Sequence, residues 1–240
     1  MDVAYRLCPE VNLWEMVGDV KRAIGWMKAN GAGYGVDPGK IVLAGGSAGA
    51  HLALLAAYTS HDSKFTPEDV QGLDLSVKGV VSYYGPPDLS AFFKDGFGRV
   101  NTPAEVEKIQ RNLLGGLLED IPELFRQASP VAYIGPGCPA TLIFQGSHDM
   151  GVPVESARIL SRKLADSGVP VIYVEFPQTD HGFDIQMRVL KLGDGSQYSP
   201  AAQAALYDLE RFLAWMVSTP GESQATETFQ RQLSFEISKE

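Results

Sequence analysis

Residues 43–58, LAGGSAGAHLALLAAY, place one serine between glycines where an apolar strand gives way to an apolar helix. The segment from Lys40 to Gly45 has the composition of a buried strand, and His51 to Tyr58 that of a helix. GxSxG between a strand and a helix is typical of a sharp, strained turn that holds Ser47 clear of the sheet. The alternative is a tight turn with an ordinary capping serine.

The rest of the chain alternates short apolar runs with helical patterns, which predicts a parallel sheet covered by helices. The helical spacing of apolar residues predicts three long helices, and Asn12 and Ser199 are the expected caps of the first and last. The expected strands are 3–7, 40–45, 77–84, 140–146 and 171–176, and the expected helices are 12–30, 155–166 and 200–217. The fold class is therefore α/β, with a mostly parallel twisted sheet flanked by helices.

A chain of 240 residues with 45% hydrophobic residues is long enough for one core, assigned here to residues 1–218. Residues 86–135 are long for one connection and are expected to form a small cap with a helix near 103–118. Phe92 and Phe93 would then line a pocket, or alternatively pack in the core. Residues 219–240 are rich in Ser, Thr, Glu and Gln and are expected to form a polar tail.

The composition excludes several functions. A net charge of -9 argues against nucleic acid as a partner, because phosphate binding needs clustered Lys and Arg. The two cysteines, Cys8 and Cys138, form no metal-ligand pattern, so no metal site is expected. No membrane span or signal peptide is visible, and a soluble protein in a reducing cytoplasm is the expectation.

Four histidines could activate the Ser47 hydroxyl. His51 lies in the helix that leads away from Ser47, and His61 lies beyond the end of that helix. His181, in the loop after strand 171–176, is better placed, because loops after parallel strands gather at one edge of the sheet. His148, in the loop after strand 140–146, is the alternative base.

A carboxylate from another loop at that edge would orient the imidazole. Asp149 follows strand 140–146 and is the expected partner, with Asp88 after strand 77–84 as the alternative. Asp180 and Asp184 are too close to His181 in sequence to reach its ring. The expected order along the chain is Ser, Asp, His, as in α/β-hydrolases.

Four blocks of sequence resemble the hormone-sensitive-lipase-like carboxylesterases of the α/β-hydrolase superfamily. They are YRLCPE (5–10), GVDPGKIVLAGGSAGAHLALLAA (35–57), QGSHDMGVPVESARILSRKLADSGVPV (145–171) and FPQTDHGF (176–183). The resemblance implies hydrolysis of esters with small or medium acyl chains through an acyl-enzyme on Ser47, with no metal or organic cofactor. The backbone N–H of Ala48 would bind the oxyanion, and Gly46 and Tyr84 would line the substrate site, although core packing of Tyr84 is equally compatible with the sequence.

Two departures from this family leave alternatives open. Gly46 stands where the family often has Asp, and the blocks also resemble arylformamidases and prolyl-oligopeptidase-like peptidases, so an amide substrate is the alternative. In this family an HGGG loop, which precedes the nucleophile in sequence, supplies most of the oxyanion hole. The sequence before Ser47 contains no HGGG motif. A strand at 3–7 with the loop Leu7–Glu10 could replace it, the chain could belong to a longer protein, or the protein could be an inactive binding relative. An apolar sheet edge left open in this way would favour a homo-oligomer.

Overall fold

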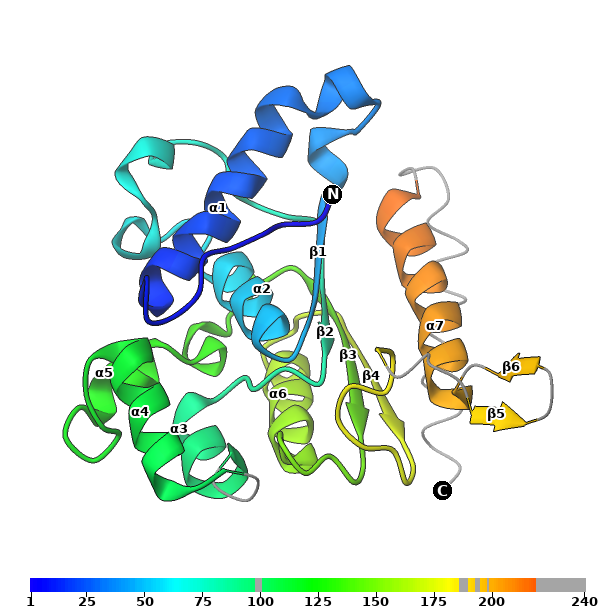
Figure 1. Cartoon of the computed structure of the whole chain (residues 1–240). Coiled ribbons are helices and arrows are strands. Elements are labelled where there is room, and N and C mark those ends of the chain that lie inside the picture. Colours follow the sequence, from blue (N-terminus) through cyan, green and yellow to red (C-terminus); the bar gives the residue numbers. More distant parts are fainter. Residues whose placement is uncertain (98–100, 186–189, 193–194, 198, 219–240) are drawn as a thin grey trace.

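The computed structural model describes residues 1–97, 101–185, 190–192, 195–197 and 199–218. Four parallel strands form one sheet in the order β1-β2-β3-β4 (Figure 1). The strands are β1 (Val42–Gly46), β2 (Gly79–Tyr83), β3 (Ala140–Gly146) and β4 (Val171–Phe176), and a separate antiparallel pair consists of β5 (Leu190–Leu192) and β6 (Gly195–Gln197). All four strands of the sheet end at one rim, and the predicted α/β fold is confirmed.

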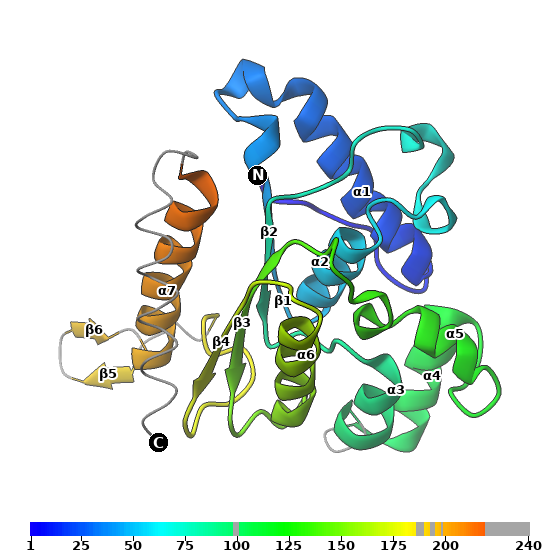
Figure 2. The ribbon, with the colours of Figure 1, turned by 180° about the vertical axis from the view of Figure 1, so that it is seen from behind.

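Helices cover both faces of this sheet. Figures 1 and 2 show α1, α2 and α6 on one face and α7 on the other. The helices are α1 (Leu13–Asn30), α2 (Ala48–Tyr58), α3 (Leu89–Ala91), α4 (Pro103–Leu114), α5 (Pro122–Gln127), α6 (Val154–Asp166) and α7 (Pro200–Val217). Asn12 caps α1 through a reciprocal pair of hydrogen bonds with Glu15, as its sequence predicts. Ser199 precedes α7 as expected, but its side chain makes no capping hydrogen bond.

The apolar strands supply a core on each side of the sheet, because successive side chains point to opposite faces. Val80 and Ile143 are fully buried against α2 and α6. Val81, Leu142 and Phe144 are buried against α7. This two-sided burial explains why the strands appear in the sequence as continuous apolar runs.

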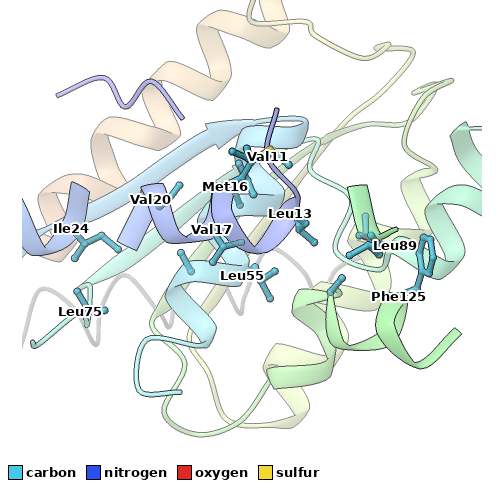
Figure 3. Close-up of a cluster of buried hydrophobic side chains, with 14 of the residues drawn as sticks. Val11, Leu13, Met16, Val17, Val20, Ile24, Leu55, Leu75, Leu89 and Phe125 are labelled. Atoms are coloured by element: carbon cyan, nitrogen blue, oxygen red, sulfur yellow. The ribbon is translucent and has the colours of Figure 1, made fainter. Parts of the chain in front are cut away.

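A third cluster joins α1, α2 and the segment 86–135 (Figure 3). Val17 of α1 and Leu55 of α2 have no exposed surface, and Phe125 of α5 packs in the same cluster. The segment 86–135 therefore packs on the helical layer beside the sheet. Helix α4 begins at the expected residue but ends at Leu114 rather than near 118.

The expected strand at 3–7 is wrong. These residues form no strand, and the backbone N–H of Arg6 donates to the Asp19 carboxylate (3.1 Å) instead of to a neighbouring strand. Within the described residues, β1 pairs only with β2. The far side of β1 borders a cavity of about 530 Å³, which residues of the N-terminal segment and of α1 also line.

Lys21 fixes the far end of the helix that follows Ser47. Its ammonium group is completely buried and donates to the carbonyl oxygen of Thr59 (2.6 Å), at the C-terminus of α2, and to Thr66 Oγ1 (3.1 Å). Burial disfavours the charged form and lowers the pKa of Lys21 from 10.5 to about 8.

This lowered pKa predicts a stability change in alkali. Between pH 8 and 10.5 Lys21 is protonated in the unfolded chain but neutral in the folded chain, so the free energy of unfolding rises with pH across this window. The stabilisation is complete above pH 10.5 and is lost as pH falls through about 8. The free energy of unfolding of wild type minus that of Lys21→Met is expected to rise by roughly 3 kcal/mol across this window. Urea denaturation at a series of pH values measures it, and a difference that does not change with pH would contradict the assignment.

Candidate active site

Ser47 lies at the turn between β1 and α2, as its sequence predicts. Its backbone has φ 53° and ψ −118°, a strained conformation for a residue with a side chain. The turn is fixed by a hydrogen bond from the Ser47 backbone N–H to the Tyr83 carbonyl oxygen (2.9 Å) at the end of β2. α2 begins at Ala48, so the hydroxyl lies beside the positive end of a buried helix.

The turn requires a glycine two residues before the serine. A Cβ atom on Gly45 would lie 2.4 Å from the backbone carbon of Gly49, closer than any relaxed contact allows. Gly49 itself has open space where its own Cβ would be. The two glycines of the motif therefore have different reasons to be there: Gly45 permits close approach of α2, whereas Gly49 is not constrained by packing.

Gly45→Ala is expected to lower the free energy of unfolding by roughly 3 kcal/mol, because the added methyl group meets backbone that cannot move away. Gly49→Ala is the matched control, and it should leave stability unchanged or raise it by up to about 1 kcal/mol, since alanine is the better helix former. Chemical denaturation of both variants measures the effect. Equal stability of the two variants would show that the turn relaxes.

Three side chains form a continuous hydrogen-bonded chain at the rim of the sheet. His181 Nε2 lies 2.9 Å from Ser47 Oγ, and His181 Nδ1 lies 2.8 Å from Asp149 Oδ2. Ser47 follows β1, Asp149 follows β3 and His181 follows β4, so the parallel sheet brings Ser47 next to His181, which is 134 residues further along the chain. The Asp149 side chain is completely buried, whereas that of His181 is 31% exposed and can meet a substrate.

Asp149 is held by four donors. The backbone N–H groups of Gly151 (2.9 Å) and Val152 (2.7 Å) donate to Oδ1, and the side-chain amide of Gln145 (2.8 Å) donates to Oδ2 together with His181. A buried carboxylate needs such donors to remain charged. The sequence did not predict this role for Gln145. It is the second-to-last residue of the apolar strand β3, where a polar amide is the only signal in the sequence.

The alternative bases and acids lie elsewhere. His148 is exposed and contacts Ser147, and His61 is also exposed. His51 is buried and its Nδ1 donates to the Pro86 carbonyl oxygen (2.7 Å), and burial lowers its pKa to about 4. It is therefore a neutral core residue at neutral pH.

The other three aspartates weighed as partners of His181 make local contacts. Asp88 accepts backbone hydrogen bonds at the start of α3, which makes it a helix cap. Asp180 accepts from the backbone N–H groups of Met150 (3.1 Å) and His181 (2.7 Å), so it ties the two loops of the site together. Asp184 accepts from the Tyr84 hydroxyl.

Of the three rings expected to contact substrate, two are buried and one is partly buried. Tyr84 is 1% exposed and Phe93 is 5% exposed. Phe93 packs edge to face on Phe125 (5.6 Å between ring centres), and partly buried Phe92 packs against the same cluster. Contact of these rings with substrate stays a prediction. Gly46 is exposed beside Ser47, and a Cβ there would lie 3.0 Å from the Tyr84 hydroxyl.

The arrangement has the chemistry of an activated hydroxyl. A histidine within hydrogen-bond reach of a serine can take its proton, and a buried carboxylate on the other ring nitrogen fixes the tautomer with a free Nε2. The backbone N–H of Ala48 is the one oxyanion donor that the motif supplies. The second donor proposed from the loop Leu7–Glu10 depended on a strand at 3–7, and that basis is lost.

The proteins of known sequence and structure that resemble this chain include several esterases. Esterase LipC of Mycobacterium tuberculosis is 35% identical over 208 residues, which cover 85% of this chain and 48% of LipC. A butyrate-bound esterase 2 of Thermogutta terrifontis superposes with a TM-score of 0.65 at 27% identity, covering 87% of this chain and 68% of the other. The same esterase phosphonylated by sarin gives a TM-score of 0.66 at 27% identity, with 87% and 68% covered.

The match is long but does not span the whole of the relatives. The chain covers about half the length of the curated esterases that it resembles. None of the helices in the described part of the chain is long and apolar enough to cross a membrane. Residues 1–164 match the family model BD-FAE, and with the solved esterases as structural neighbours, the chain belongs to the BD-FAE family and has the α/β-hydrolase fold of hormone-sensitive-lipase-like carboxylesterases.

Proposed function

We propose that this protein is a serine hydrolase that cleaves carboxylic esters with small or medium acyl chains. The observation that carries the proposal is the hydrogen-bonded chain from Ser47 Oγ through His181 to buried Asp149. The esterase activity named for its relatives and the butyrate bound to one of them support an ester substrate.

In the proposed reaction Ser47 Oγ attacks the ester carbonyl while His181 Nε2 takes the hydroxyl proton. Asp149 stabilises the imidazolium that forms. His181 then donates the proton to the leaving alcohol, and an acyl group remains on Ser47. Water, deprotonated by the same imidazole, attacks the acyl-enzyme and releases the carboxylic acid. The backbone N–H of Ala48, the first residue of α2, is the proposed donor to the developing oxyanion.

The substrate site is proposed at the rim formed by Gly46, Ser47 and His181, with the segment 86–135 as its cap. That segment leaves the sheet at Tyr84, directly beside the site. The tail 219–240 lies outside the described residues. The free cysteines Cys8 and Cys138 support a reducing cytoplasmic location. Among the described strands β1 pairs with β2 alone, which supports self-association through its other edge.

Parallel assays test the substrate class. Initial rates are measured with p-nitrophenyl butyrate, N-formylkynurenine and an aminoacyl p-nitroanilide at equal concentration. The proposal expects hydrolysis of the ester to exceed that of either amide. A preference for an amide would assign the protein to the amide-cleaving alternative, and no turnover of any of them by folded protein would favour an inactive relative.

A further inference from the structure

Tyr84 lies beside both Gly46, the residue before the nucleophile, and the ring of His181. It directly follows β2, is 1% exposed, and its backbone N–H donates to the Phe144 carbonyl oxygen (2.7 Å) in β3. Its φ of 42° turns the chain so that the ring lies at the rim of the sheet. On one side the hydroxyl lies close to Gly46, where an added Cβ atom would lie 3.0 Å from it, a tight contact.

On the other side Tyr84 contacts the loop that carries His181. The centres of the Tyr84 and His181 rings are 4.5 Å apart, and Phe183 packs edge to face on Tyr84 at 5.4 Å. The Tyr84 hydroxyl donates a hydrogen bond to the Asp184 carboxylate, three residues after His181. Tyr84 therefore contacts side chains at three of the four positions from His181 to Asp184, the other being Gly182.

The hydroxyl is a permanent donor. Burial and the neighbouring Asp184 carboxylate raise the pKa of Tyr84 well above its ordinary value, so the phenol keeps its proton at every pH at which an esterase is assayed. A hydrogen bond from a neutral donor to a carboxylate is stronger than one between two neutral groups.

The Tyr84–Asp184 hydrogen bond is one of several restraints on the loop that carries His181. Phe183 is 3% exposed and packs on Phe176, and Gly182, directly after the base, has φ 71°, a conformation that favours glycine. On the N-terminal side of His181 the loop is tied by Asp180 to Met150. On the C-terminal side Asp184 makes the corresponding tie to the sheet through Tyr84.

We propose that Tyr84 and Asp184 are positioning residues that hold the imidazole of His181 within hydrogen-bond distance of Ser47. The inference deepens the proposed function and rests on it. Neither residue contacts the reacting atoms; the pair sets the distance between β1, which carries the nucleophile, and the loop that carries the base.

The matched test removes the hydrogen bond from each side. Tyr84→Phe and Asp184→Ala are each expected to lower kcat for p-nitrophenyl butyrate by roughly 10- to 100-fold while KM changes little, because the fraction of correctly placed imidazole falls and substrate binding does not. The double variant should be no worse than the worse single variant, since both remove one interaction. Asp184→Asn keeps an acceptor oxygen and should retain activity within a few-fold of wild type.

Tyr173→Phe is the control. Tyr173 in β4 also donates to a carboxylate, Glu175 (2.6 Å), but away from Ser47, so its loss should leave kcat unchanged. Wild-type kcat in Tyr84→Phe, or an Asp184→Asn variant as impaired as Asp184→Ala, would overturn the proposal. Circular dichroism confirms that each variant is folded.

Hydrogen–deuterium exchange separates this inference from the proposed function. Exchange in residues 180–185 should accelerate in Tyr84→Phe and not in Tyr173→Phe, whether or not the protein hydrolyses esters. If wild type turns over no ester but this segment still loosens, the proposed function fails and the restraint on the loop stands. If exchange is unchanged in Tyr84→Phe, the positioning role fails independently of activity.

Discussion

Ser47→Ala is expected to lower kcat for p-nitrophenyl butyrate by roughly 10⁵- to 10⁶-fold, because the variant lacks the hydroxyl that His181 Nε2 contacts. Steady-state assays with a correction for background hydrolysis measure the loss. Binding and the Ala48 backbone N–H remain, so a small residual rate above that of water is compatible with the mechanism.

Ser147→Ala is the matched control for this variant. Ser147 Oγ also lies beside a histidine, 3.2 Å from His148 Nδ1, but that pair lacks a buried carboxylate partner in the described contacts. Its removal should change kcat by no more than a few-fold. A Ser47→Ala enzyme that retains more than about one hundredth of wild-type kcat would mean that another group is the nucleophile.

Asp149→Asn is expected to lower kcat by roughly 10⁴-fold with little change in fold. The backbone N–H groups of Gly151 and Val152 both donate to Oδ1, so the oxygen of an asparagine would stay on that side. Its NH₂ group would then face His181 Nδ1, which must become the acceptor. The proton is left on Nε2, and that nitrogen can no longer accept the proton of Ser47.

The comparison variant is Asp180→Asn. Asp180 accepts two backbone hydrogen bonds through the same oxygen and makes none to the imidazole ring, so an amide can replace it. The variant should keep kcat within a few-fold of wild type. A loss in Asp149→Asn of less than tenfold would show that the carboxylate does not set the tautomer.

Strands were predictable where a continuous apolar run lies between polar loops. β3, in the interior of the sheet, and β4, at its edge, both begin and end at the expected residues. The failure at 3–7 has a physical reason. A short apolar run becomes a strand only when another strand satisfies its backbone, and here Asp19 bonds the backbone of Arg6 instead.

The arrangement of Ser47, Asp149 and His181 was predictable because each is a polar residue directly after a parallel strand. The residues that hold them in place were not. Gln145 and Tyr84 lie at the ends of apolar strands, where the sequence pattern cannot separate a packing residue from one that holds a loop. Asp184 was set aside because it is too close to His181 along the chain to reach the imidazole ring. That argument is correct for the ring, but it does not address whether Asp184 holds the loop in place.

The central claim is that Ser47, activated by His181, is a nucleophile in the folded protein. A fluorophosphonate reacts covalently with an activated serine. The Thermogutta terrifontis esterase, a structural neighbour, has been phosphonylated by sarin. Tandem mass spectrometry after labelling is the most direct measurement. We predict one adduct, on Ser47, in wild type and at least a hundredfold slower labelling in His181→Ala. Folded wild-type protein with no adduct on Ser47, or with the adduct on another residue, would contradict the account.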